Sequence, residues 1–212
     1  MSELIVPEQG LIYEPWEPQD GSQVDALDAR YIVDELFVGG NRGGGKTDWL
    51  LNDFGADVVP WGPAWKGILF RKKFFHMAED SDAEKHLGLQ YTWIGYDELP
   101  HWPSQGPYNR LKATNRSAIK GVPKRIRATG NPGGPGLGGI KEYFSIPNDT
   151  GDQGGELVKT TEIDPVTKQE ISRTKMFLRS TLYENKKLLE ADPSYSLTIK
   201  EATVGNDQLY KA

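Results

Sequence analysis

Apolar runs alternate with polar segments and glycines along the first 130 residues, and this rhythm predicts short strands and helices. The runs are rich in Val, Ile, Phe, Tyr and Trp, which is typical of buried strands. Strands are expected at 31–38, 67–71, 91–96 and 125–129, and helices at 46–54, 78–87 and 108–117. Strands that alternate with helices predict an α/β fold with a mainly parallel central sheet flanked by helices.

The pattern changes after the fourth strand. Segment 131–136 is rich in Pro and Gly and predicts a loop. Two β-prone arms within 156–182 surround the turn 164–167 and predict a β-hairpin insertion, whose last arm at 176–181 is a candidate for a further sheet strand. A final helix is expected to begin at Asp192, an N-cap residue that is followed by proline.

Length and composition indicate one globular domain. A chain of 212 residues can bury one sizeable core. No apolar run approaches the roughly 20 residues that span a bilayer, the first ten residues lack the pattern of a secretory signal, and there is no cysteine. We therefore expect a cytosolic protein with no membrane contact and no thiolate metal site. Residues 1–30 predict an extended lead-in, 31–205 the α/β domain, and 206–212 the start of a linker.

Charge is distributed unevenly along the chain. The net charge of −5 argues against a protein that simply coats nucleic acid. The window from Leu99 to Lys141, however, contains eight Lys or Arg and no Asp or Glu. Such a window is either a solvated face or a surface that contacts an anion, and the sequence leaves both interpretations open.

The segment after the first strand matches the pattern G-x-x-x-x-G-K-[ST] in full. Its residues are Gly40, Asn41, Arg42, Gly43, Gly44, Gly45, Lys46 and Thr47. Glycines let the backbone wind so that successive N–H groups surround a phosphate at the N-terminus of the following helix. In such a loop the lysine reaches the β- and γ-phosphates and the threonine hydroxyl binds Mg²⁺. The preceding strand and the helical run behind the loop favour nucleotide binding over a turn without a ligand.

Polar residues also end the third and fourth strands. Asp97 and Glu98 follow the third strand, where an Asp can hold the Mg²⁺ shell and the adjacent Glu can polarise the water that attacks the γ-phosphate. Thr129, Gly130 and Asn131 follow the fourth strand. A short polar group there can contact the γ-phosphate and respond to its loss, and ordinary turn chemistry before a proline is the alternative.

Four segments together resemble the large terminase subunit of tailed bacteriophages. The order of the segments and the residues within each agree with that family, and the resemblance covers most of residues 12–205. The segments are 39–48, 67–71, 91–99 and 128–136. The resemblance implies a P-loop NTPase fold of the ASCE type. It also implies a packaging motor that uses ATP and Mg²⁺ to drive double-stranded DNA into the procapsid.

The resemblance implies a role for each motif. Lys46 and Thr47 would form the first nucleotide motif, and Asp97 and Glu98 the second. Residues 129–131 would couple hydrolysis to movement. Gln23 resembles the upstream glutamine that reads adenine in this family.

The resemblance also implies partners. The family assembles as a ring, expected to be a pentamer, on the portal protein, and works with a small terminase subunit. It acts in the cytoplasm of the bacterial host and transiently at the procapsid portal vertex. An arginine of a neighbouring subunit is thought to complete each site, and Arg42, Arg110 and Arg116 are the candidates. Contact with DNA or a neighbouring subunit is expected from Arg110, Arg116, Lys120 and Lys124.

Two departures from the family keep other interpretations open. The passage around 74–75 is shorter than in the family, and the nuclease domain is absent, so no nuclease activity is expected. One alternative is a shortened, non-catalytic portal- or DNA-binding remnant, although the intact lysine and acid motifs argue against it. A second alternative is another DNA-dependent P-loop ATPase, such as a helicase.

Overall fold

A six-stranded sheet forms the centre of the molecule in the computed structural model, which describes residues 15–71, 84–149 and 151–202. The strands are β1 (Glu35–Gly40), β2 (Gly67–Arg71), β3 (Trp93–Asp97), β4 (Arg125–Gly130), β5 (Val158–Ile163) and β6 (Glu170–Ser180). They lie in the order β2-β3-β4-β1-β6-β5, and every neighbouring pair is parallel except β5 and β6. The carboxyl ends of five strands therefore meet at one edge of the sheet.

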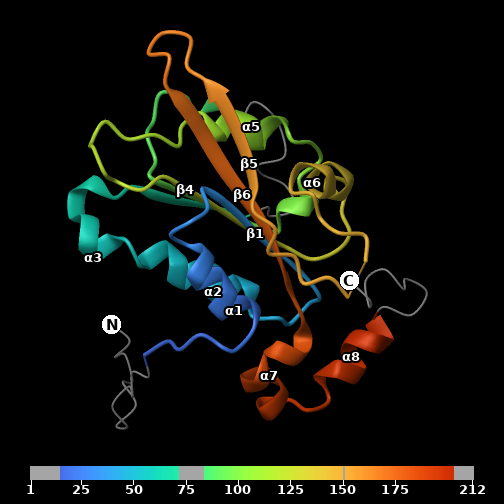
Figure 1. The fold of residues 1–212 in the computed structure, drawn as a ribbon. Helices are drawn as coiled ribbons and strands as arrows, with labels where there is room; N and C mark the ends of the chain where they lie inside the picture. Colours follow the sequence, from blue (N-terminus) through green and yellow to red (C-terminus); the bar gives the residue numbers. More distant parts are fainter. Residues whose placement is uncertain (1–14, 72–83, 150, 203–212) are drawn as a thin grey trace.

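Short helices surround this sheet; several cover its two faces, and others lie beyond its ends (Figure 1). They are α1 (Ser22–Ala29), α2 (Lys46–Gly55), α3 (Val58–Trp61), α5 (Gly106–Lys112), α6 (Leu137–Tyr143), α7 (Lys186–Ala191) and α8 (Tyr195–Ala202), together with the 3₁₀ turns η1 (Gly62–Ala64), η2 (Leu99–His101) and η3 (Leu182–Glu184). The predicted α/β class, with a mainly parallel sheet flanked by helices, is confirmed. No helix in the described part of the chain is long and apolar enough to cross a membrane.

The two faces of the sheet carry separate hydrophobic cores. Successive strand side chains point to opposite faces, so Leu36 and Val38 of β1 pack with α1 and α2, whereas Phe37 packs with α5 and α6. Phe177 of β6 belongs to the same core as Phe37, and its neighbour Met176 to the other. The central strands β1, β3 and β4 are thus buried on both sides, which explains why β1 and β3 are nearly continuous apolar runs, whereas β5 at the edge is mostly exposed.

The predicted hairpin is confirmed. β5 and β6 pair antiparallel, and the Asp164 carboxylate closes the turn by accepting the N–H groups of Val166 and Thr167 at 2.8 and 2.6 Å. Lys168 adopts a left-handed conformation at the end of the turn, with φ 58°. β6 then continues into the main sheet beside β1, as expected for the last arm. One strand therefore connects the hairpin to the edge where the polar motifs lie.

Several element predictions need correction. The segment 1–30 is not extended throughout, because residues 22–29 form α1, whose Ala26 and Ala29 are buried against the sheet. β1 begins at Glu35 rather than at 31, since Tyr31 and Ile32 are largely exposed. α6 was not predicted, because two glycines obscure its apolar pattern.

Helix boundaries also differ from the predictions. α5 ends at Lys112 instead of 117, where the Thr114 hydroxyl donates to the Leu111 carbonyl at 2.6 Å and begins a turn. The last helix begins at Tyr195 rather than Asp192, because the Asp192 carboxylate accepts the Ser194 N–H at 3.1 Å within a turn. Of the predicted helix 78–87, residues 78–83 lie outside the described residues, as does the shortened junction at 74–75.

Candidate nucleotide site at the carboxyl edge of the sheet

The glycine-rich loop between β1 and α2 requires its glycines. Gly40, Gly43 and Gly45 have φ values of 126°, 82° and 74°, which residues with a Cβ rarely adopt. A Cβ at Gly40 would lie 2.1 Å from the Ser180 carbonyl oxygen, and one at Gly44 would lie 2.2 Å from the Ser180 hydroxyl. The loop is therefore wound tightly against the carboxyl end of β6, and no larger residue fits at these positions.

Three side chains hold three successive carbonyls of this loop. Asn185 Nδ2 donates to the Gly43 carbonyl at 2.6 Å. Ser180 Oγ donates to that of Gly44 at 2.9 Å, and Gln23 Nε2 to that of Gly45 at 2.9 Å. In a trans peptide the N–H points away from the preceding carbonyl, so the following N–H groups turn to the opposite side. The three side chains thus fix the orientation of three consecutive peptide groups of the loop.

Lys46 is buried at the start of α2 beside acidic groups. Its ammonium donates to the carbonyls of Gly40, at 3.3 Å, and Asn41. Burial lowers the pKa of Lys46 to about 8, although the negative charges of Glu98, Asp97 and Glu184 act in the opposite direction. A buried cation with only carbonyl partners gains from a nearby anion, because the anion offsets the cost of removing the charge from water.

Asp97 connects three strands at this edge. Its Oδ1 accepts the hydroxyls of Thr47, at 3.1 Å, and Thr129, at 2.7 Å. Its Oδ2 lies 3.1 Å from Arg71 Nε at the end of β2, a contact favoured by the register that pairs Arg71 with Asp97. The predicted metal-shell pair of Thr47 and Asp97 is therefore brought together, along with a cation that the sequence did not single out.

Glu98 adopts a strained backbone conformation and contacts the end of β4. Its φ and ψ are 59° and 46°, a left-handed conformation that costs a non-glycine residue about 1–2 kcal/mol. Its carboxylate accepts the Asn131 N–H at 3.2 Å and a second bond from the Asn131 side-chain amide. Its own N–H donates to Thr129 Oγ1 at 3.4 Å. The second acid of the motif and the 129–131 segment thus form one hydrogen-bonded unit.

A magnesium ion bound to a nucleotide fits this donor set better than a metal held by protein alone. The described residues contain no group of three or more His, Cys, Asp or Glu that could hold a metal ion. Mg²⁺ is usually bound through one or two protein oxygens together with water and phosphate oxygens. The Thr47 hydroxyl and the Asp97 carboxylate would provide those protein oxygens.

Gln23 lies against the loop. The residue is buried, its amide oxygen accepts the Gln19 N–H at 2.8 Å, and its amide nitrogen binds the Gly45 carbonyl. Both ends of the side chain therefore contact backbone, and its role in reading adenine remains a prediction. Arg42 is exposed on the outer side of the loop.

The acid-free window separates into a buried and an exposed part. Arg125 and Arg127 are buried. Arg125 pairs with Asp57, which follows α2, and Arg127 pairs with Asp53 in the last turn of α2 at 3.5 Å. Arg30 pairs with both of these acids. The candidates Arg116, Lys120 and Lys124 are exposed, and Arg110 forms a surface ion pair with Glu84 at 2.9 Å. The window is therefore less cationic at the surface than its sequence indicates.

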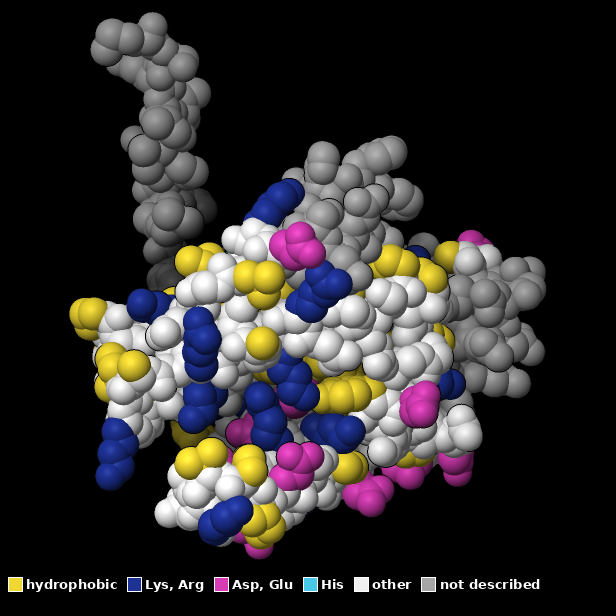
Figure 2. Space-filling view, turned by 90° about the horizontal axis from the view of Figure 1, so that it is seen from above, with side chains coloured by type: hydrophobic (Ala, Val, Ile, Leu, Met, Phe, Trp, Pro, Cys, Tyr) yellow, Lys and Arg dark blue, Asp and Glu magenta, His cyan; other side chains and the backbone are white. Residues whose placement is uncertain are grey.

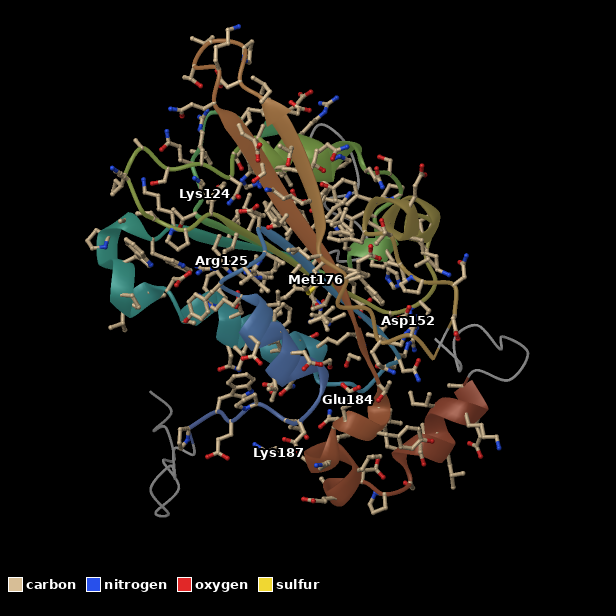
Figure 3. All side chains as sticks on the ribbon, viewed as in Figure 1. Lys124, Arg125, Asp152, Met176, Glu184 and Lys187 are labelled. Atoms are coloured by element: carbon tan, nitrogen blue, oxygen red, sulfur yellow. The ribbon has the colours of Figure 1, made fainter. Side chains whose placement is uncertain are left out.

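The most informative residues that sequence reasoning missed are Ser180 and Asn185. Neither belongs to a recognisable motif, and they lie more than 130 positions from the loop whose carbonyls they bind. Only the parallel register that pairs Gly40 with Ser180 brings them there. Glu184 lies beside them in η3 and accepts the Ser22 N–H at 3.0 Å, which attaches α1 to the same edge (Figure 3).

Comparisons with known proteins leave the family open. No protein-family model matches the chain, and no curated protein matches it. The interpretation of the site therefore depends on the geometry described above.

Proposed function

We propose that the chain is a Mg²⁺-dependent ATPase with a P-loop NTPase fold of the ASCE type. The observation that carries the proposal is the convergence of Lys46, Thr47, Asp97 and Glu98 at the carboxyl ends of β1 and β3. In open α/β sheets, ligands bind outside the carboxyl ends of the strands. β4 lies between these two strands and contributes Thr129 and Asn131 to the same edge.

Each residue has a chemical role in this proposal. The N–H groups of the loop and the Lys46 ammonium bind the phosphates, and the cation offsets their negative charge. Mg²⁺, held through Thr47 and Asp97, would neutralise charge on the transferred phosphoryl group. Glu98 orients and polarises the attacking water. Asn131, bonded to Glu98 through its backbone and its side chain, is suited to move when the γ-phosphate is lost.

The particular motor we propose is the ATPase domain of a terminase large subunit, which couples hydrolysis to translocation of double-stranded DNA into the procapsid. The four segments in family order support it, and so does the hydrogen-bonded unit of Glu98 with the 129–131 segment. A ring on the portal protein, contact with the small terminase subunit, and a place at the portal vertex of the procapsid in the bacterial cytoplasm belong to this proposal. A helicase-like ATPase remains the alternative.

ATP turnover of the chain tests the proposal, measured without DNA, with double-stranded DNA and with single-stranded DNA. We expect Mg²⁺-dependent hydrolysis that double-stranded DNA stimulates. Stronger stimulation by single strands would favour the helicase alternative. Nucleotide binding without any hydrolysis, even at high protein concentration where a ring forms, would favour the non-catalytic remnant.

A further inference from the structure

A second polar pocket lies at the opposite, amino-terminal edge of the sheet. Its volume is 380 Å³ and its walls come from the start of β1, the ends of α5 and α6, and the β5–β6 hairpin. Its lining includes Glu35, Lys112, Tyr143, Thr160, Arg173 and Lys175. Figure 2 looks onto the end of the molecule that carries the hairpin turn, and Lys and Arg side chains gather near the middle of this face.

A buried carboxylate organises the pocket. Glu35 is 2% exposed, and its Oε1 lies 2.6 Å from the Lys112 ammonium and 3.4 Å from Arg173 Nε. Its Oε2 accepts the hydroxyls of Tyr108, at 2.6 Å, and Tyr143, at 2.8 Å. Burial and the charge of Glu35 raise the pKa of both phenols, which keeps them protonated donors. Each oxygen of the Glu35 carboxylate thus has two polar neighbours.

The cations around Glu35 exceed what this carboxylate neutralises. One cation would balance one buried carboxylate, yet both Lys112 and Arg173 contact it. Lys175 adds a third positive charge, with its ammonium 4.1 Å from the centre of the Tyr143 ring. Glu162 is the other acid in the lining, and it is exposed on β5. Three cations against two carboxylates leave the pocket with a net positive charge.

The remaining donors suit a phosphate group. Arg173 faces Glu35 through Nε and donates from one terminal nitrogen to Asn115 Oδ1 at 3.5 Å, which leaves its other terminal nitrogen for a ligand; its side chain is 42% exposed. Thr160 and Ser172 line the same pocket and carry hydroxyl donors, whereas the Thr174 hydroxyl and N–H are bound to Asp34 at 3.1 and 2.8 Å. A guanidinium beside an ammonium and hydroxyls is the usual donor set for phosphate in proteins.

We propose that this pocket binds a phosphate group, either of the double-stranded DNA backbone or of a small free anion. No residue of the pocket belongs to the edge that carries Lys46. Binding of a free anion goes beyond the proposed function, whereas binding of the DNA backbone deepens the proposed translocation and rests on it. Glu35 holds Lys112 and Arg173 in position before any ligand arrives, which lowers the entropy cost of binding.

The test compares two double variants that lose equal charge. Arg173→Gln/Lys175→Gln removes two cations of the pocket. Lys159→Gln/Lys168→Gln removes two from the same hairpin outside the lining, where Lys159 pairs with Glu170 at 3.6 Å. Affinity for a short DNA duplex is measured by fluorescence anisotropy across a salt series, and affinity for inorganic phosphate by calorimetry with acetate as the control anion.

We expect the pocket variant to lose about tenfold in affinity for at least one of the two probes and the control variant to keep it. If the probe is DNA, the slope of log affinity against log salt should fall by about 0.9, the value for one phosphate. Loss for phosphate alone would identify a free anion as the ligand. Equal losses in the two variants, or no loss in either, would overturn the proposal.

Two further measurements keep the result interpretable. Lys175→Gln alone leaves both contacts to Glu35 in place, so a loss of binding in this single variant is not a folding effect. ATP turnover without DNA should be the same in the pocket variant and the parent, because the loop and the acids lie at the other edge. A chain that hydrolyses no ATP would end the proposed function and leave the binding assays of the pocket valid.

Discussion

The two edges of the sheet hold charged groups in different ways. At the carboxyl edge, the loop is shaped through its backbone. Glycines allow its winding, and Asn185, Ser180 and Gln23 each bind one of its carbonyls. At the amino-terminal edge the pocket is made of long side chains around the Glu35 carboxylate. A loop shaped by its own backbone requires glycines at fixed positions, so it can be recognised as a motif in the sequence. A pocket of side chains from five elements leaves no such motif.

The largest effect should come from Glu98, because it lies at the carboxyl edge and acts on the chemical step in the proposed mechanism. Glu98→Gln keeps the size and polar character of the side chain but removes its basicity. We expect nucleotide affinity to be maintained and ATP turnover to fall by about 100- to 10,000-fold. DNA and phosphate binding at the other edge should not change. Turnover equal to that of the parent would show that Glu98 is not the general base.

Lys46→Ala tests whether nucleotide binding at the carboxyl edge is independent of DNA binding at the amino-terminal edge. The substitution removes the cation that would contact the phosphates, and nucleotide affinity should fall by roughly 100-fold. Binding of a fluorescent ATP analogue measures this loss, and Lys46→Arg is the matched control that retains the charge. If DNA affinity falls as far as nucleotide affinity, the two edges are not independent and the comparison fails.

Buried Lys46 should also make stability depend on pH in the alkaline range. The pKa is about 8 in the folded chain and near 10.5 for an unperturbed lysine, so the unfolded state binds more protons between these values. The free energy of unfolding should therefore rise as the pH increases from about 8 to 10.5, by up to ~3 kcal/mol. Urea unfolding at several pH values measures the rise. It should disappear in Lys46→Met, and an identical rise in that variant would assign it to other groups.

Ser180→Ala tests whether side-chain donors shape the loop. The Gly44 carbonyl would lose its partner at 2.9 Å, and an unsatisfied buried group costs about 1–3 kcal/mol. We expect nucleotide affinity to fall by roughly tenfold and turnover at saturation to change little. Ser172→Ala, on the same strand near the hairpin, should leave nucleotide affinity unaltered. An effect of similar size in both variants would indicate a general loss of stability.

The smallest effect should come from the exposed cations of the acid-free window. Lys120→Glu/Lys124→Glu changes residues outside the loop and outside the lining of the pocket, with Lys124 just before the start of β4 (Figure 3). If they contact the DNA backbone in an assembled motor, affinity should fall and the salt slope should decrease by about 0.9 for each lost phosphate contact. An unchanged slope and affinity would show that they form a solvated face.

The sequence predicted the parts of the molecule that depend on local pattern. The strands, the hairpin turn at Asp164 and the Gly40–Thr47 loop follow from apolar runs and glycine positions. The contact of Thr47 with Asp97 could be expected. Thr47 comes after the loop that follows β1, Asp97 ends β3, and the two parallel strands end at the same edge. α1 and α6 were not recognised, since a short helix with few apolar residues, or with several glycines, has little periodicity.

The residues that sequence reasoning missed depend on register. Arg71 meets Asp97, and Ser180 meets the glycine loop, only because particular residues of neighbouring strands lie side by side. The acid-free window misled for the same reason. Its Arg125 and Arg127 are buried and pair with Asp57 and Asp53, which are remote in sequence and adjacent in space.

β1 takes part in both polar regions: Glu35 begins it and Gly40 ends it. Its neighbour β6 does so too, with Arg173 and Lys175 in the pocket and Ser180 against the loop. Five residues of extended chain separate Glu35 and Gly40 by roughly 16 Å. Neighbouring strands pair with β1 on each side, so it can neither stretch nor bend appreciably. Any ångström-scale shift of the loop must therefore be transmitted along the strand or absorbed as slippage against β4 and β6. If both regions hold phosphates, the covalent geometry of a single strand sets the distance between them.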